Sequence, residues 1–200
     1  MQGLYALKPW YARRLQVITD DAVRRGISPD VFTLIGVLGA VAAALVIWRG
    51  WWWAALIALA IRLAGANLDG AVARARGVSR PWGFVLNEIG DRLSDLLMFA
   101  GLTALAAREY AGWSSPQVGY VLVAAVAATL PTFASLAAAG AGATRRNGGP
   151  FGKTERCLVA VLATAFPGAL TFWAALIVIG SLGTAIARLS ATHRELVAAS

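Results

Sequence analysis

The sequence is poor in the residues that form disulfides and soft-metal sites. It holds one cysteine, Cys157, and one histidine, His193, among 200 residues. A single cysteine excludes an intrachain disulfide, and we interpret Cys157 as a small buried apolar residue rather than a reactive thiol. We interpret His193, which stands beside Arg194 and Glu195, as a surface residue without a metal role.

Charged residues are also scarce. Only 14% of the residues are Asp, Glu, Lys or Arg, whereas 58% are hydrophobic; soluble domains typically have about 25% charged and about 45–50% apolar residues. Apolar runs close to the length of a bilayer span recur along the chain. We therefore expect an all-α, polytopic membrane protein. Residues 2–26 lack the continuous apolar stretch of a signal peptide, and we do not interpret them as one.

The apolar runs divide into six expected transmembrane helices. Their approximate bounds are residues 30–48, 52–72, 82–106, 118–140, 156–166 and 170–189. The fifth run is short and has to extend at either end, and Pro167-Gly168 makes a tight turn before the sixth. We thus expect a transmembrane domain over residues 27–200. Residues 1–26 mix apolar and basic side chains and are expected to form an amphipathic helix in the membrane interface, although an ordinary juxtamembrane anchor fits them equally.

Basic residues are distributed unequally between the two sides of such a six-helix bundle. The opposite side carries only Arg49 and Arg108, whereas most other basic residues fall near the termini and in the loops after the second and fourth spans. This bias predicts that both termini lie on the cytoplasmic side of the cell membrane. The net charge of +8 is then explained by anchoring to anionic lipid headgroups, and we expect no binding of nucleic acid.

Several acidic residues interrupt the apolar runs near the cytoplasmic side. Asp69 lies near the end of the second span, and Asn87, Asp91 and Asp95 recur every four residues at the start of the third. This spacing places the three on one helical face. Because a short loop joins the two spans, we expect Asp69 to approach Asn87 and Asp91.

Two explanations account for this cluster of oxygen ligands. Without a nearby cysteine or histidine, such a cluster suits Mg²⁺, Mn²⁺ or Ca²⁺ better than zinc. A structural salt-bridge cluster with Arg74 and Arg92 is the alternative. Glycine beside these acids, at Gly70 and Gly83, either leaves room for a phosphate-bearing ligand facing Arg74 or allows close helix packing.

The same residues resemble the signature of the CDP-alcohol phosphotransferase family. That signature reads D-x-x-D-G-x-x-A-R, eight residues, then G-x-x-x-D-x-x-x-D. This chain reads A-N-L-D-G-A-V-A-R, eight residues, then G-F-V-L-N-E-I-G-D. The spacing is intact, but Ala66 and Asn87 replace two of the four aspartates. Pro29 and Thr33 in addition resemble the Pro-x-x-x-Thr segment that opens the first span of the family, and "DRLSD" is similar to the bacterial members that make phosphatidylinositol phosphate or phosphatidylglycerol phosphate.

The resemblance implies a reaction and a set of roles. Members of the family transfer a substituted phosphate from a CDP-linked donor such as CDP-diacylglycerol to a small alcohol, release CMP, use Mg²⁺ or Mn²⁺, and are typically homodimers in the lipid membrane. By the resemblance, metal ligands are expected at Asp69, Asn87 and Asp91, with Asp91 also the catalytic base. The nucleotide pocket would be lined by Gly70, Ala73, Arg74 and Gly83.

The two departures from the signature leave three hypotheses open. Ala66 supplies no ligand, and Asn87 supplies a neutral oxygen without charge. The chain is therefore an active membrane phosphotransferase of phospholipid biosynthesis with an altered site, a catalytically impaired member that binds CDP-lipid or an active partner, or a non-enzymatic transporter or scaffold.

A second basic region suggests a place for the acceptor. Residues 145–156, "RRNGGPFGKTER", and Arg188 present several basic side chains on the cytoplasmic side. We expect them either to hold a phosphorylated acceptor or to anchor to headgroups. The glycines and proline of the loop favour flexibility, and the loop is expected to close over a ligand.

Overall fold

The computed structural model describes residues 8–199, and all of its regular structure is helical. The all-α fold class is therefore confirmed for this part of the chain. The helices are α1 (Lys8–Arg24), α2 (Pro29–Trp48), α3 (Trp52–Ala75), α4 (Pro81–Glu109), α5 (Pro116–Gly140), α6 (Lys153–Ala165), the short 3-10 turn η2 (Pro167–Ala169) and α7 (Leu170–Ala199). They form two compact units, residues 8–105 and residues 106–199, with the boundary near the end of α4.

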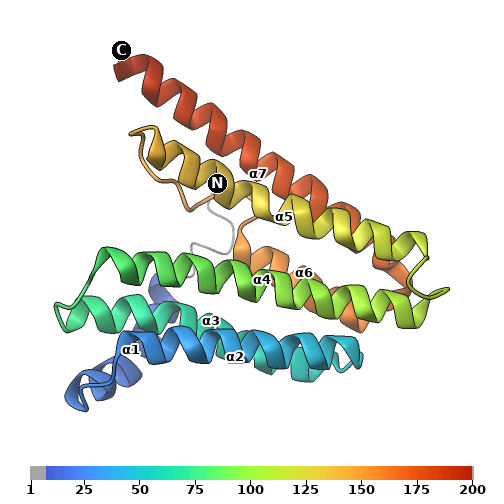
Figure 1. Cartoon of the computed structure of the whole chain (residues 1–200), viewed down its shortest axis with the longest axis horizontal. Helices are drawn as coiled ribbons and strands as arrows, with labels where there is room; N and C mark the ends of the chain where they lie inside the picture. The colour runs from blue at the N-terminus through green and yellow to red at the C-terminus, as the bar shows by residue number, and fades with distance from the viewer. Residues whose placement is uncertain (1–7, 200) are drawn as a thin grey trace. The chain divides into compact units, whose positions relative to one another are not determined.

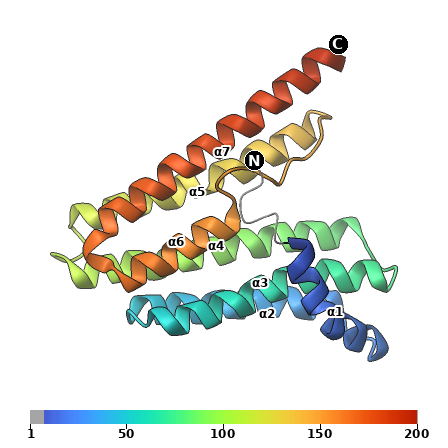
Figure 2. The same ribbon diagram turned by 180° about the vertical axis from the view of Figure 1, so that it is seen from behind.

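In the first unit, the long helices α2, α3 and α4 run side by side (Figure 1). Helix α1 lies against α3, which is easiest to follow from behind (Figure 2). Near the end of α1, Asp21 accepts a hydrogen bond from Arg24 at 3.0 Å and pairs with Arg25 at 2.8 Å. These two bonds hold the pKa of the Asp21 carboxyl below its ordinary value, so this end of the helix keeps both signs of charge at neutral pH.

The start of α2 follows from its sequence. Pro29 occupies the first helical turn, where its missing N–H costs nothing. The Ser28 hydroxyl accepts a hydrogen bond from the backbone N–H of Asp30 at 3.3 Å and caps the helix. At the far end, Gly50 takes a positive φ of 77°, a conformation that suits glycine, and turns the chain into α3. These caps fix Thr33 on the second turn of α2.

Glycines bring the backbones of the first unit into close contact. A Cβ atom on Gly65 of α3 would lie 2.5 Å from the backbone nitrogen of Gly36 on α2. A Cβ atom on Gly101 of α4 would lie 2.4 Å from the carbonyl oxygen of Ala44. Small residues at these crossings permit the tight helix packing that is common in membranes. They set how α3 and α4 lie against α2, and so place the polar residues at the ends of these helices.

Four helices of the described chain are long and apolar enough to cross a membrane, namely α2, α3, α5 and the segment of η2 and α7. Helix α4 has 29 residues but also carries Glu88, Asp91, Arg92 and Asp95. Helix α6 has 13 residues, about 20 Å at 1.5 Å per residue, which is shorter than the ~30 Å hydrocarbon layer. The expected count of six spans is therefore not confirmed.

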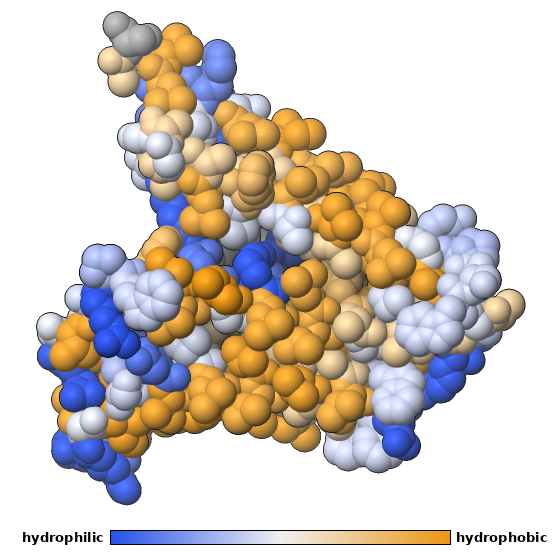
Figure 3. Space-filling model, in the orientation of Figure 1, coloured by the Kyte–Doolittle hydropathy of each residue, from blue (hydrophilic) through white to orange (hydrophobic). Residues whose placement is uncertain are grey.

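The outward faces of the helices are apolar. Leu34, Leu38 and Leu45 of α2 are all more than half exposed, and they recur at helical spacing along one side. Orange, hydrophobic atoms cover much of the visible face in Figure 3. Such a surface suits lipid and not water, in agreement with a multi-pass membrane protein.

In the second unit, α5 and α7 lie side by side (Figure 1). The turn η2 joins α6 to α7, where the sequence predicts a tight connection at Pro167-Gly168. The Tyr110 hydroxyl donates to the carbonyl oxygen of Pro167 at 2.8 Å. Cys157 is buried on α6 and His193 is exposed on α7, which confirms the predicted burial of the one and the predicted exposure of the other.

Candidate functional site

The carboxylate of Asp69 is the centre of a polar cluster in the first unit. Asp69 is only 6% exposed. Its Oδ2 accepts hydrogen bonds from the Thr33 hydroxyl, at 3.0 Å, and from the side-chain amide of Asn87. Its Oδ1 accepts from the backbone N–H of Gly70. All three donors are electrically neutral, so none of these bonds cancels the charge of the carboxylate.

Three helices build this cluster. Thr33 comes from the second turn of α2, Asp69 from the last turns of α3 and Asn87 from the first turns of α4. A Cβ atom on Gly90 of α4 would lie 3.1 Å from the Thr33 methyl group, which shows how closely α4 approaches α2 at this level. The expected approach of Asp69 to Asn87 is thus present in the structure. Asp91 lies one turn beyond Asn87 on α4 and is half-buried.

The residues expected to line a nucleotide pocket follow Asp69 on α3 and open α4. Ala73 and Gly83 are half-buried, and Arg74 is exposed. The Arg74 Nη1 lies 3.1 Å from where a Cβ atom on Gly70 would stand. Glycine at position 70, next to Asp69 in the sequence, therefore lets the guanidinium of Arg74 lie over the end of α3. A larger residue there would require this arginine to move.

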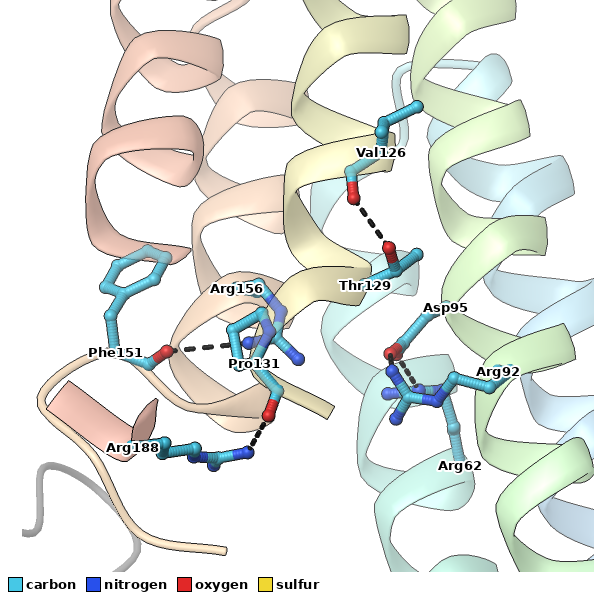
Figure 4. Close-up of polar contacts among 9 residues, drawn as sticks. All are labelled: Arg62, Arg92, Asp95, Val126, Thr129, Pro131, Phe151, Arg156 and Arg188. Atoms are coloured by element: carbon cyan, nitrogen blue, oxygen red, sulfur yellow. Dashed lines mark hydrogen bonds and ion pairs between the residues drawn. The ribbon is translucent and has the colours of Figure 1, made fainter. Parts of the chain in front are cut away.

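A second polar cluster lies deeper in the same unit. Asp95 of α4 forms ion pairs with Arg62 of α3 and with Arg92, the latter at 2.9 Å. Figure 4 shows both arginine side chains pointing at the one carboxylate. Arg62 is 1% exposed and Asp95 is 7% exposed. The structural salt-bridge hypothesis therefore holds for Asp95 and its arginines, whereas Asp69 accepts its hydrogen bonds from neutral groups.

Sequence reasoning missed two members of these clusters. Thr33 was singled out only as part of a segment resembling the family, without a role, and the structure gives it a hydrogen bond to Asp69. Arg62 received no role from the sequence, although it is a basic residue within an apolar run. A charged residue inside an apolar run needs a partner, and this signal pointed to an acid on the neighbouring helix.

The donor chemistry of the first cluster suits a hard divalent cation. Asp69 and Asp91 offer carboxylate oxygens and Asn87 an amide oxygen, the ligand types that Mg²⁺ and Mn²⁺ prefer. Within residues 8–199, however, no group of three or more His, Cys, Asp or Glu side chains gathers closely enough to hold a metal ion. The described residues therefore offer few charged ligands to such a cation.

Arg188 in the second unit has a structural role. Its Nε, Nη2 and Nη1 donate hydrogen bonds to the carbonyl oxygens of Gly148, at 3.0 Å, Asn147, at 2.6 Å, and Pro131. Figure 4 shows its contact with Pro131 and the contact of Arg156 with the carbonyl of Phe151. Arg188 and Arg156 are both buried. Arg188 thus donates to backbone carbonyls of three residues of the chain.

The loop between α5 and α6, which is expected from its composition to be flexible, makes several hydrogen bonds to side chains of α7. The Thr184 hydroxyl contacts both the N–H and the carbonyl of Phe151, at 3.0 and 3.1 Å. Glu195 accepts hydrogen bonds from Thr144 and pairs with Arg146 at 2.6 Å. Glycine and proline content indicates which turns a loop can make. Whether the loop is held in one position depends on contacts such as those made by these side chains of α7.

The comparisons with known proteins identify the family. A model of the CDP-alcohol phosphatidyltransferase family matches residues 26–187. This match spans most of the chain, including both polar clusters.

The chain belongs to the CDP-alcohol phosphatidyltransferase family.

Its relatives in this family include several bacterial proteins. The phosphatidylinositol phosphate synthase of Mycolicibacterium smegmatis is 32% identical over 166 residues, which cover 81% of this chain and 72% of that protein. The same enzyme of Streptomyces avermitilis is 27% identical over 211 residues, covering 98% of this chain and 84% of the relative.

Solved structures of the family lead to the same assignment. A crystal structure of Mycobacterium tuberculosis phosphatidylinositol phosphate synthase with CDP-DAG bound aligns with a TM-score of 0.76 and 28% identity, over 90% of this chain and 94% of that one. A second crystal structure of that enzyme, with manganese and citrate, aligns with a TM-score of 0.73 and 28% identity, over 88% and 87% of the two chains.

Membership of the CDP-alcohol phosphatidyltransferases confirms the predicted function class. The family makes phospholipids from CDP-linked lipid donors, is membrane-bound and uses divalent metal ions. The prediction of a membrane transferase of phospholipid biosynthesis is therefore correct.

Proposed function

We propose that the chain transfers a phosphatidyl group from CDP-diacylglycerol, or a similar CDP-linked donor, to a small alcohol and releases CMP. The observation that carries this proposal is the cluster of Thr33, Asp69 and Asn87 at the adjoining ends of α2, α3 and α4, within a chain of this family. A CDP-DAG-bound relative aligned over 90% of the chain supports the choice of donor.

The nucleotide half of the donor binds beside Asp69 in this proposal. Gly70 and Gly83 leave space next to the backbone, Ala73 borders it, and the exposed guanidinium of Arg74 pairs with a phosphate oxygen. Asp69, Asn87 and Asp91 would hold a divalent cation, Mg²⁺ or Mn²⁺. When bound, such a cation neutralises charge on the diphosphate and on the departing nucleotide.

Asp91 serves as the catalytic base. The hydroxyl oxygen of the alcohol bonds to the phosphorus that carries the diacylglycerol, and its proton passes to the Asp91 carboxylate. The bond from that phosphorus to the bridging oxygen breaks, and CMP leaves with this oxygen. Positioning of both substrates supplies much of the catalysis in such phosphoryl transfers.

The surroundings of the site complete the proposal. The chain works in the cell membrane as a homodimer, with six spans, an interfacial helix at its N-terminal end, and the termini and active site on the cytoplasmic side. The interfacial helix α1 presents exposed Trp10, Val17 and Ile18 to the headgroup region. A lipid donor and a water-soluble acceptor meet most directly at this interface.

Release of CMP tests the function directly. Purified protein is incubated with CDP-diacylglycerol, Mg²⁺ or Mn²⁺, and a panel of alcohols that includes inositol phosphate, and CMP and the lipid product are measured. Asp91→Asn should abolish turnover while the protein keeps its helical content. Asp21→Asn, the same chemical change on α1, should leave turnover unchanged. Full activity of Asp91→Asn would show that another residue is the base.

A second candidate function is donor binding without turnover, alone or with an active partner chain. It is favoured by Ala66 and Asn87, which remove two carboxylates at signature positions. Saturable binding of CDP-diacylglycerol without CMP release, with any alcohol of the panel, would decide for this candidate.

A further inference from the structure

Polar side chains bridge α3 and α4 at two levels. At the first level, the Asn87 amide of α4 donates a hydrogen bond to the Asp69 carboxylate of α3. At the second level, the Arg62 guanidinium of α3 pairs with the Asp95 carboxylate of α4. On α3, Arg62 stands seven residues before Asp69. On α4, Asp95 stands eight residues after Asn87. With 3.6 residues per turn, the two bridges are therefore about two turns apart on both helices.

Asp91 lies midway between the two bridges on α4. It stands four residues after Asn87 and four residues before Asp95, so the three share one helical face. The first bridge fixes α4 about one turn before Asp91, and the second bridge fixes it about one turn after. Arg92, the next residue after Asp91, adds an ion pair with Asp95 at 2.9 Å within the same turn. The turn that carries Asp91 is thus held at both of its ends.

Helix α2 supports the backbone on both sides of the second bridge. A Cβ atom on Gly39 of α2 would lie 2.9 Å from the backbone nitrogen of Arg62. On α4, a Cβ atom on Gly90, the residue before Asp91, would lie 3.1 Å from the Thr33 methyl group of α2. Contacts between small apolar groups have no preferred direction, whereas a buried ion pair is satisfied in one register. The ion pair therefore decides which turn of α4 faces α3 at this level.

We propose that the bridge between Arg62 and Asp95 positions the catalytic base, because it holds the turn of α4 that carries Asp91 in register with α3. Arg62 and Asp95 are then positioning residues, which act through Asp91. Arg62 is 1% exposed and Asp95 is 7% exposed, so solvent and salt screen the pair little. This inference rests on the proposed function, in which Asp91 is the base.

The kinetics of a double variant test the role in catalysis. Arg62→Met combined with Asp95→Leu removes both partners of the bridge, an exchange that often preserves folding. We expect kcat for CMP release to fall about ten- to a hundredfold, because a displacement of ~1 Å at a reacting group has an effect of this size. KM for CDP-diacylglycerol should change by less than about twofold, since donor binding is not altered. A folded double variant with the kcat of the wild type would overturn the proposal.

Conservative and control variants separate positioning from a general loss of structure. Arg62→Lys keeps the positive charge and should retain more of kcat than Arg62→Met; equal losses would contradict a role of the ion pair. The matched control is Arg25→Met combined with Asp21→Leu, the same exchange in an exposed pair within α1, where the two side chains lie 2.8 Å apart. We expect an unchanged kcat for this control. A comparable fall would mean that the loss of any ion pair has this effect.

A distance measurement tests the proposal without turnover. In a Cys157→Ala background, nitroxide labels are attached to Ile61→Cys on α3 and Leu93→Cys on α4, since both positions are exposed. Pulsed electron paramagnetic resonance should give one narrow distance distribution, which broadens or shifts when the two exchanges at the bridge are added. An unchanged distribution would overturn the proposal, whether or not the chain releases CMP. If the double variant does not fold, Arg62→Lys provides the comparison in both measurements.

Discussion

At the scale of single residues, the role of Thr33 shows what a hydroxyl can do at the edge of a membrane. Its Oγ1 donates to Asp69 at 3.0 Å, and its methyl group faces the backbone of Gly90. A hydrogen bond to a charged group is worth about 1.5–3 kcal/mol. Thr33 thus orients the carboxylate and packs against α4 at the same time.

Thr33→Val should separate these two contributions, since valine keeps the shape and loses the hydroxyl. We expect the unfolding free energy to fall by about 1–3 kcal/mol, seen as a lower thermal midpoint in detergent. Thr33→Ser keeps the hydroxyl and should lose less. Equal midpoints for wild type and Thr33→Val would mean that this hydrogen bond contributes nothing to stability.

At the scale of helices, the buried ion pairs connect α3 to α4. Asp95 is paired with Arg62 and Arg92 below the Asp69 cluster. Removal of one partner of a buried pair leaves an uncompensated charge, whereas replacement of both by apolar residues is often neutral. We therefore expect the pair to fix the position of α3 relative to α4, and to contribute little net stability.

A double-mutant cycle tests this interpretation. Asp95→Leu should lower stability by about 3–5 kcal/mol, and Arg62→Met by less, because Arg92 still pairs with Asp95. The double variant should lose clearly less than the sum, since no unpaired charge remains between the helices and Arg92 is partly exposed. Thermal unfolding of the four proteins in detergent provides the measurement, and additive losses would contradict the pairing.

The expectations for single helices succeeded where local rules decide. The apolar run expected over residues 30–48 agrees closely with α2, Pro29–Trp48. The spacing of four residues placed Asn87 and Asp91 on one face of α4. Rules of this kind could not show that Arg188 holds the α5–α6 loop, because its hydrogen bonds join segments 40 or more residues apart.

At the scale of the whole molecule, the distribution of basic residues predicts the sidedness of the chain in the membrane. Arg49 lies in the turn between α2 and α3, and Arg194 lies near the end of α7; both are exposed. With six spans, these two positions fall on opposite sides of the bilayer. With only the four long apolar helices as spans, these two positions would again fall on opposite sides, whereas the connections after α4 and after α5 would change sides.

Labelling of single cysteines checks the topology. In a Cys157→Ala background, Arg49→Cys should react with a membrane-impermeant maleimide in intact cells, and Arg194→Cys only after permeabilisation. Cys157 itself is buried, so its replacement removes background labelling without changing an exposed face. Labelling of Arg194→Cys in intact cells would contradict a cytoplasmic C-terminal end.

The sequence by itself determined the class of this protein, because apolar runs, charge bias and signature spacing are properties of the chain order. It also named Asp69 and Asn87 as neighbours, since a short loop joins their helices. Only the tertiary structure decided which groups satisfy each charge: neutral donors for Asp69, two arginines for Asp95, backbone carbonyls for Arg188. Partner choice depends on which side chains helix packing brings within hydrogen-bond reach, and spacing along the chain does not contain that information.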